Sequence, residues 1–197
     1  MDIKAVDVKK LRDLTGFGMM DAKAALQEAK GDLAKATKLL QKRGAELAEK
    51  KSDRNAGQGV IASYIHAGDR IGVLVELNCE TDFVARNKDF QKLAYNLAVH
   101  VAGMQPLYVA PDDVPKDVIA KEMALYKSQA KDKPKAAADQ LVAGKLNGFY
   151  ESVCLLKQPY VLDQDKPVEA LITEAVGAWK ENIHVSRFVR FEVGERE

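Results

Sequence analysis

The sequence predicts an α+β protein in two parts, a compact helical unit over residues 1–54 and a larger core over residues 55–197. Three observations support this prediction. Glycines divide the first 50 residues into short amphipathic helices, a hairpin of alternating apolar residues opens the core, and a similar alternating segment lies near the C-terminus. A small antiparallel sheet with helices packed on it is typical of the α+β class.

Three short helices are predicted in the N-terminal unit. A first apolar stripe over residues 6–14 ends at Gly16, and a second helix over residues 19–29 ends at Gly31. Asp32 has the side chain of an N-cap for the third helix, because its carboxylate can accept a hydrogen bond from a free backbone N–H. The third helix carries apolar residues at helical spacing, namely Leu33, Ala36, Leu39 and Leu40.

Three strands are predicted in the core. Residues 60–65 and 71–78 flank a Gly-containing turn and form an antiparallel hairpin. Every other residue from Ile71 to Leu77 is apolar, which gives this strand one face for the core. The third strand is expected near the C-terminus, where Val185, Val189, Phe191 and Val193 alternate with Ser186, Arg190 and Glu192.

The sequence between the hairpin and the last strand is predicted to be helical. Prolines mark the breaks, because proline lacks a backbone donor and ends or kinks a helix. We expect these helices to pack on the sheet. They cover residues 90–103, 116–130, 134–150 and 168–179.

The composition argues against nucleic-acid and membrane partners. The chain has 30 basic and 29 acidic residues, so its net charge of +1 gives no overall field that attracts phosphate backbones. No apolar run approaches the roughly 20 residues that span a bilayer, and residues 1–4 do not begin a secretion signal. We therefore expect a cytoplasmic chain in which Cys79 and Cys154 stay reduced, since two cysteines are too few for a disulfide framework.

No catalytic or metal-binding pattern stands out, so an enzyme, a cofactor and a bound metal are not expected. His66, His100 and His184 lie in different predicted elements without the spacing of a triad or a metal site. The sequence also lacks a Gly-rich phosphate loop. We expect His100 to pack within its helix, His66 to lie at the exposed hairpin tip, and His184 to lie at the surface before the last strand.

Residues 76–86 place an acidic side chain beside a large ring at the end of the second strand. Two interpretations follow from the residues alone. In the first, Thr81 caps the next helix and Phe83 is tucked into the core. In the second, Asp82 and Phe83 are presented together, and Phe83 is a wedge aimed at another protein.

The segment over residues 76–86 resembles the second signature of the elongation factor Ts family. Residues 11–26 are similar to the opening signature of this family, and residues 190–195 are similar to its last strand. The three matches occur in the family's order and extend over essentially the whole chain. The N-terminal helices, with their Gly-Phe-Gly loop, also resemble the ubiquitin-associated fold, which presents a small apolar patch to partners.

The resemblance implies a guanine-nucleotide exchange factor that acts on elongation factor Tu in translation elongation, without covalent chemistry or a cofactor. It implies that the segment Thr81, Asp82, Phe83 and Val84 inserts into the GTPase domain of the partner and dislocates its Mg²⁺. The helical unit is then implied to grip the same domain elsewhere. The implied partner-binding residues are Arg12, Met19, Met20, Lys23, Lys51 and His66.

Other roles remain open for several of these residues. One of the pair Met19 and Met20 can belong to the core, and the charge-rich residues 41–59 are also typical of a solvated helix and linker. The chain could instead be a binding adaptor that uses its helical unit. A ribosome or RNA accessory protein would use the basic residues Lys42, Arg43, Lys50, Lys51 and Arg54.

The length of the chain suggests a homodimer. Longer members of the family carry two related α+β modules and a helical hairpin insertion, whereas this chain contains a single module. A lone three-stranded sheet has one face that lacks full cover. We therefore predict that two copies pack sheet against sheet and hold two partner molecules.

Overall fold

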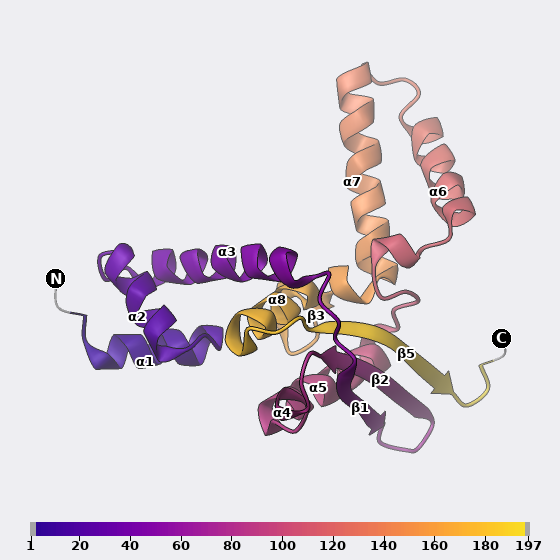
Figure 1. The fold of residues 1–197 in the computed structure, drawn as a ribbon. Coiled ribbons are helices and arrows are strands. Elements are labelled where there is room, and N and C mark those ends of the chain that lie inside the picture. Colours follow the sequence, from indigo (N-terminus) through magenta and orange to yellow (C-terminus); the bar gives the residue numbers. More distant parts are fainter. Residues whose placement is uncertain (1–2, 196–197) are drawn as a thin grey trace.

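The computed structural model describes residues 3–195 (Figure 1). The predicted α+β class is confirmed, because a helical part lies beside a small antiparallel sheet that packs against helices. Two further helices project away from the rest as a hairpin. The elements are α1 (Ala5–Thr15), α2 (Met19–Glu28), α3 (Leu33–Lys51), β1 (Gln58–Ile65), β2 (Ile71–Cys79), α4 (Asp82–Ala85), α5 (Lys88–Met104), η1 (Pro111–Asp113), α6 (Lys116–Gln129), α7 (Lys135–Val153), η2 (Leu155–Lys157), β3 (Pro159–Tyr160), β4 (Asp163–Pro167), α8 (Val168–Trp179) and β5 (His184–Glu192).

The first three helices end and begin at the residues that the sequence indicates. α1 ends at Gly16, whose φ of 72° is the left-handed conformation that glycine adopts easily. Asp32 caps α3, since its Oδ1 accepts a hydrogen bond from the backbone N of Lys35 at 3.0 Å. The helices enclose a small core of Val8, Leu11, Phe17, Ala22, Ala25, Leu26, Ala29, Ala36 and Leu40.

The helical part is joined to the core through α3, which packs on α8. The contact depends on Phe17, from the loop between α1 and α2. A Cβ atom at Gly177 of α8 would lie 2.2 Å from the Cζ atom of this ring, and one at Gly44 of α3 would lie 3.2 Å from it. The two glycines therefore leave the space in which Phe17 docks against α8.

The main sheet has the order β1-β2-β5, and both pairs of neighbours are antiparallel. Helix α5 packs against β1 and β2. The predicted inward face of β2 is confirmed, because Ile71 is partly buried and the next three alternate residues are fully buried. These residues and α5 build the main core, which includes Val73, Val75, Leu77, Phe90, Ala94, Leu97 and Val101.

The predicted last strand is present as β5, but its alternation is interrupted at Ser186. The pairing of β2 with β5 shifts between Glu76 and Leu77, so that one extra residue of β5 lies opposite this step. Such a bulge moves every following side chain to the other face of the sheet. Val185 is buried, but the next residues to face inward are Phe188 and Arg190, whereas Val189, Phe191 and Val193 are exposed.

The helices of the hairpin α6 and α7 do not pack on the sheet, which corrects the prediction for this part of the chain. They project from the core (Figure 1), and none of their described residues is buried. The hairpin is fixed at its base, where the backbone N–H groups of Leu107 and Tyr108 donate to the carbonyl of Val153 at 2.8 and 3.0 Å. The short strands β3 and β4 and the one-turn helix α4 were not expected from the sequence.

His100 has the packing role that its apolar neighbours predict. The backbone N–H of Val161 donates to its Nδ1 at 3.1 Å, so Nε2 carries the proton and donates to Gln158 Oε1 at 3.0 Å. The Gln158 amide donates in turn to the carbonyls of Met104 and Ser152. Burial lowers the pKa of His100, so the neutral ring is part of a fully satisfied internal network.

The two cysteines are both buried free thiols. Burial is the main cause that raises the pKa of Cys79 and of Cys154 to about 11. Within residues 3–195, no helix is long and apolar enough to cross a lipid bilayer.

Candidate partner-binding site

The turn between β2 and α5 holds the one-turn helix α4 at the surface. We call residues 80–86 the α4 turn. Thr81 is the N-cap of α4, since its hydroxyl oxygen accepts a hydrogen bond from the backbone N of Val84 at 3.4 Å. Arg86 pairs with Asp82 at 3.0 Å one turn away. The predicted capping role of Thr81 is confirmed, although Asp82 and Phe83 begin a helix instead of ending a strand.

Phe83 projects from the α4 turn into solvent, with 82% of its surface exposed. Its neighbour Val84 is 8% exposed and belongs to the main core, so it anchors the turn from below. The interpretation in which Phe83 is tucked into the core is therefore wrong. Burial of a phenyl side chain contributes about 1.5–3 kcal/mol, and in this fold that free energy remains available for binding.

A surface hollow of about 510 Å³ lies beside Phe83. Its wall combines carboxylates, a guanidinium, a hydroxyl and the exposed ring, so it can contact both charged and apolar groups of another molecule. The lining residues are Gln58, Glu80, Thr81, Asp82, Phe83 and Arg86.

Glu181, which lies between α8 and β5, holds the first residues of the α4 turn. Its Oε2 accepts hydrogen bonds from the backbone N of Glu80 at 3.0 Å and of Thr81 at 3.1 Å. Its Oε1 accepts a hydrogen bond from the hydroxyl of Thr81 at 2.6 Å. Hydrogen bonds to an ionised acceptor are roughly twice as strong as neutral ones, so this one carboxylate fixes the start of α4.

Glu80 connects the α4 turn to the end of α3. Its Oε1 accepts a hydrogen bond from the backbone N of Asn182 at 2.7 Å, and its carboxylate lies 3.7 Å from Lys51 Nζ and 3.6 Å from Arg54. The bond from Asn182 is the main cause of a lowered pKa for Glu80, with the two cations contributing. Lys51 is only 8% exposed, so the structure gives this side chain an internal contact and leaves little of it for a partner.

The helical part exposes the residues that the resemblance indicates. Met19 and Met20, at the start of α2, are 42% and 77% exposed, so the interpretation that one of them is buried in the core is wrong. Lys23 is exposed on the same helix, and Arg12 on α1 is half exposed beside Asp13. These four side chains line accessible surface of α1 and α2.

His66 lies at the tip of the β1–β2 hairpin, as predicted, and is exposed. Its Nδ1 is 2.9 Å from the hydroxyl of Tyr64, and the Tyr64 ring packs edge-on against Tyr95. The α4 turn follows the other end of β2, nine residues away along the strand, which is about 30 Å at ~3.4 Å per residue. The structure therefore does not bring His66 and Phe83 together in one copy of the chain.

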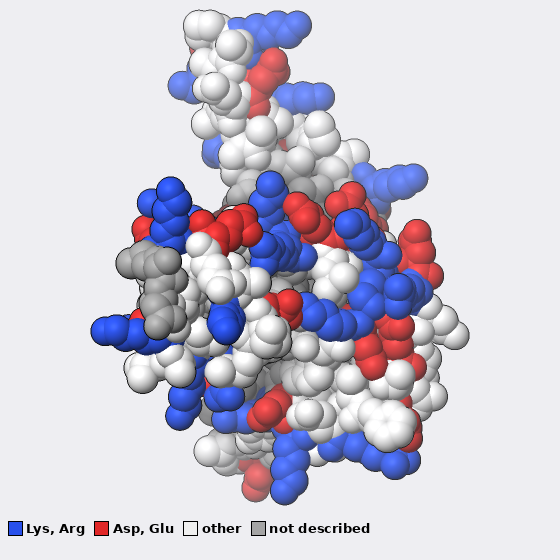
Figure 2. Space-filling view, turned by 60° about the vertical axis from the view of Figure 1, so that its left-hand side comes forward, with Lys and Arg blue, Asp and Glu red and all other residues white. Residues whose placement is uncertain are grey.

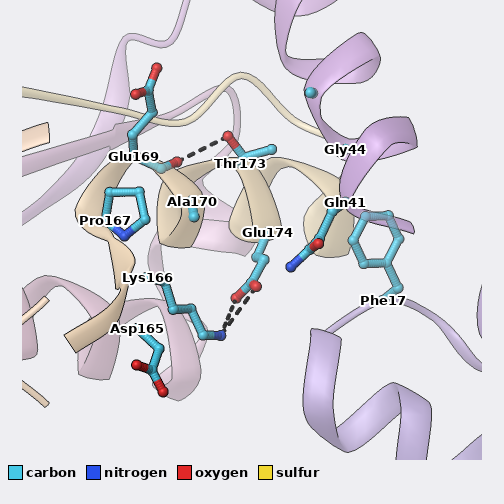
Figure 3. Close-up of a pocket in the computed structure, with 11 residues that line it drawn as sticks. Phe17, Gln41, Gly44, Asp165, Lys166, Pro167, Glu169, Ala170, Thr173 and Glu174 are labelled. Carbon is cyan, nitrogen blue, oxygen red and sulfur yellow. Dashed lines mark hydrogen bonds and ion pairs between the residues drawn. The ribbon is translucent and has the colours of Figure 1, made fainter. Parts of the chain in front are cut away.

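A second cavity of about 500 Å³ lies between α3, α8 and β4 (Figure 3). Lys166 and Glu174 form an ion pair of 3.2 Å in it, and Phe17 and Gly44 lie on the side of the helical part. Burial is the main cause that raises the pKa of Glu174, against the opposing effect of Lys166. None of the predicted site residues lines this cavity.

The outer face of the sheet presents exposed apolar side chains. We call Ile61, Ile65, Leu74, Val189 and Phe191 the open sheet face. They are between 38% and 67% exposed. A salt bridge of 2.7 Å between Arg187 and Glu76 lies on the same face and lowers the pKa of Glu76. The β5 residues reach this face because of the bulge, a feature that simple alternation in the sequence does not reveal.

Figure 2 shows Lys and Arg interspersed with Asp and Glu over the visible face, without a large area of one sign. In the part of the chain that the structure describes, no group of three or more His, Cys, Asp or Glu side chains is arranged to hold a metal ion.

Sequence reasoning missed Glu80, Glu181 and Asn182 as parts of this site. Glu80 adjoins the segment that the resemblance emphasises, but its hydrogen bonds with Glu181 and Asn182 join it to residues about 100 positions away. Glu181 and Asn182 look like ordinary linker residues between a helix and a strand. No local spacing connects them with Thr81, so only the three-dimensional fold shows the connection.

Comparisons with known proteins match nearly the whole chain. A family model described as "Elongation factor TS" matches residues 14–195. The chain is 52% identical to elongation factor Ts of Thermotoga maritima over 195 residues, covering 99% of this chain and 98% of the relative. It is 52% identical to the Pseudothermotoga lettingae protein, covering 99% and 100%, and 50% identical to the Moorella thermoacetica protein, covering 98% and 96%.

Proposed function

The chain belongs to the elongation factor Ts family, and from that premise we propose how it acts on elongation factor Tu. It is a guanine-nucleotide exchange factor of translation elongation, which binds the GDP form of this GTPase so that GDP leaves and GTP can bind. The finer proposal is that the α4 turn enters the partner's nucleotide site and that Phe83 dislocates the Mg²⁺ there.

Exchange of this kind requires no covalent chemistry from the chain. A ligand that binds the nucleotide-free partner more tightly than the GDP form must weaken GDP binding by the same factor. Each ~1.4 kcal/mol of this difference changes the affinity for GDP about tenfold. The chain therefore acts through the free energy of its own contacts, and it needs no cofactor.

The Mg²⁺ of the partner is an effective target, because it neutralises the charge of the bound phosphates. In the proposal, the Phe83 ring displaces the loop that supports the ion, and Asp82 reorganises the hydrogen bonds around it. Thr81 holds the start of α4 while Val84 anchors the turn. The observation that carries the proposal is an aromatic ring with 82% exposure on a turn that hydrogen bonds to a residue 100 positions away hold in place.

The helical part supplies a second grip on the partner. Met19 and Met20 suit an irregular protein surface, because thioether side chains adapt their shape, and Lys23 and Arg12 supply charge beside them. His66 is assigned a further contact at the hairpin tip. Lys51 acts indirectly in this proposal, by pairing with Glu80 and so supporting the α4 turn.

We extend the proposal to a homodimer that forms through the open sheet face. Exposed apolar areas of this kind mark interfaces in soluble proteins, and two sheets pack about 10 Å apart when their faces meet. Phe191 is 66% exposed on this face, so Phe191→Asp is expected to give monomers in light scattering. A wild-type chain that scatters as a monomer at micromolar concentration contradicts this part of the proposal.

The function is tested by mixing the chain with elongation factor Tu loaded with fluorescent GDP. With excess unlabelled GTP present, the fluorescence should fall many times faster than without the chain. A second run at several Mg²⁺ concentrations tests the finer step, since a factor that dislocates the ion should accelerate release less when Mg²⁺ has already been chelated. If release is equally fast with and without the chain, the proposed function is wrong.

A further inference from the structure

We infer that the turn over Lys180, Glu181 and Asn182 is a positioning hub that sets the α4 turn and the helical part in place together. This inference rests on the proposed function, because it concerns the placement of the two surfaces that grip the partner. The three residues are consecutive, and together they contact α2, the α4 turn and the segment after α3. They are positioning residues and need not touch the partner.

Lys180 holds the helical part. Its Nζ lies 3.1 Å from Asp21 Oδ2 on α2 and 5.1 Å from the centroid of the Phe17 ring. Asp21 is two residues from Met19 and one from Met20, so this contact is made directly beside the exposed methionines. The ion pair is half exposed, so it is a modest contact, and the cation–π contact supplements it.

Glu181 holds the α4 turn through the three hydrogen bonds described above, to the backbone N atoms of Glu80 and Thr81 and to the Thr81 hydroxyl. These bonds fix the residue that caps α4. The cap in turn determines the direction in which the next residues, Asp82 and Phe83, leave the core. The orientation of the exposed ring therefore depends on a carboxylate 100 positions away.

Asn182 holds the segment that follows α3. Its side-chain amide donates hydrogen bonds to the carbonyls of Ser52 at 3.1 Å and Arg54 at 2.7 Å, and its backbone N donates to Glu80 at 2.7 Å. Asn182 is 8% exposed, so these bonds are shielded from water. One residue thus connects the end of the helical part with the α4 turn.

The hub is itself fixed by the core on both sides. Val176 of α8 and Ile183 before β5 are 2% and 3% exposed, and Lys180 ends α8 in the left-handed conformation with φ of 57°. A rigid support and three directed contacts give one defined spacing between Met20 and Phe83. A partner that is gripped at both sites meets a preorganised pair of surfaces, which reduces the entropy lost on binding.

The inference predicts a separation of kinetic effects. Glu181→Ala should lower the maximal rate of GDP release at saturating factor about tenfold, because it frees the turn that carries Phe83. Lys180→Ala should instead raise the half-saturating concentration a few-fold with little change in the maximal rate, because it loosens only the grip of the helical part. Glu151→Gln, an exposed carboxylate on α7, is the matched control and should change neither quantity.

Two further variants separate positioning from direct action and from unfolding. Glu181→Gln should recover most of the rate, because its amide oxygen can still accept from both backbone N–H groups. If the carboxylate acted on the partner's cation, this variant would be as slow as Glu181→Ala. Thr81→Val removes the hydroxyl donor, and its effect should not multiply with that of Glu181→Ala, because both variants break the same contact.

A measurement on the chain without its partner tests this inference independently of the proposed function. Hydrogen exchange of the Thr81 amide should be faster in Glu181→Ala than in the wild type, with the emission of Trp179 as a check that the fold is intact. If Glu181→Ala changes neither the exchange of the Thr81 amide nor the maximal rate of GDP release, the inferred hub is wrong. If the wild-type chain fails to release GDP but the Thr81 amide still responds, the proposed function fails and the structural assignment of the hub stands.

Discussion

The α4 turn and the α6–α7 hairpin both project from the core, but they are held in opposite ways. Glu181 and Asn182, about 100 positions away, hold the α4 turn through hydrogen bonds. The hairpin is instead fixed at its base by backbone hydrogen bonds, and its two helices contact each other, as Lys145 and Gln129 do. The turn combines an exposed ring with a fixed backbone. The comparison teaches that an exposed surface can lie on a backbone held by distant residues or on one held only at its base, and we propose that the held α4 turn is the recognition site.

The largest expected effect comes from Phe83→Ala. Truncation of an aromatic anchor at the centre of an interface typically costs 2 kcal/mol or more, so we expect GDP release at saturating factor to slow by about 30-fold or more. Complex formation should weaken far less. The measurement is stopped-flow release of fluorescent GDP, with affinity measured separately on the nucleotide-free partner.

Leu162→Ala is the matched control for Phe83→Ala, because Leu162 is 61% exposed and lies outside the α4 turn. It should leave the release rate unchanged. The free energy of unfolding of both variants should lie within about 0.5 kcal/mol of the wild-type value, since neither side chain is buried. An unaltered rate of GDP release for Phe83→Ala would contradict the wedge role of Phe83. It would also contradict the functional contrast between the α4 turn and the α6–α7 hairpin.

A pair of asparagine variants sharpens the comparison further. Asn182→Ala leaves the carbonyls of Ser52 and Arg54 without their donor in a site shielded from water, so it should lower the free energy of unfolding by about 1–3 kcal/mol. Asn147→Ala, on α7, removes an exposed contact to Glu151 and should change stability by less than about 0.5 kcal/mol. Urea unfolding measures the loss of stability in each variant. Equal losses would contradict the distinction between the buried contacts of Asn182 and the exposed contact of Asn147.

The pH dependence of the free energy of unfolding should follow the ionisation of Glu80. Its pKa in the folded chain lies below the ordinary value of 4.5, chiefly because the backbone N–H of Asn182 donates to it. The stabilisation is therefore fully present above pH 4.5 and is lost as the pH falls through the lowered value. Glu80→Gln should be less stable than the wild type at pH 7, and this difference should shrink when urea unfolding is repeated at about pH 3.5.

Asp117 provides the control for this pH experiment. Its pKa is also lowered, by the hydrogen bond from Lys121 on the exposed face of α6. Exposed pairs of this kind contribute little to stability, so Asp117→Asn should match the wild type closely at both pH values. If Asp117→Asn lost as much stability at pH 7 as Glu80→Gln, the location of a carboxylate would not determine its contribution to stability.

The smallest expected effect is that of a change on the outer surface of the hairpin. Leu125 is 49% exposed on α6, and Leu125→Ser should change the free energy of unfolding by less than about 0.5 kcal/mol and leave GDP release within about twofold. The same stopped-flow and urea measurements apply. A strong reduction in the rate of GDP release would show that the hairpin also contacts the partner. The contrast between the hairpin and the α4 turn would then be wrong.

The local features of the fold could be predicted from the sequence. The Asp32 cap, the paired strands around His66 and the helix over residues 168–179 follow from hydrogen-bonding side chains, alternation and proline position. These signals depend on neighbours within a few residues. The family signatures likewise pointed to Phe83, whose exposure the structure then established.

The features that depend on distant residues could not be predicted. The bulge beside Ser186 depends on how β5 pairs with β2, and it places Phe191 on the face opposite to that of Val185. The contact of Glu181 with Thr81 joins parts of the chain that have no common local pattern. The projection of α6 and α7 also lacks a clear local signal, because their apolar residues at helical spacing can pack against each other as well as against a sheet.

The position of Glu181 near the end of the chain has a consequence for the order of events during synthesis. Translation proceeds from the N-terminus, so the segment that carries Phe83 leaves the ribosome long before its holding carboxylate exists. Contacts between such distant positions also form slowly during folding. A nascent chain thus displays the ring on a loop that Glu181 does not yet hold, and under the proposed function it becomes competent for exchange only after Glu181 has been synthesised and has bound the α4 turn.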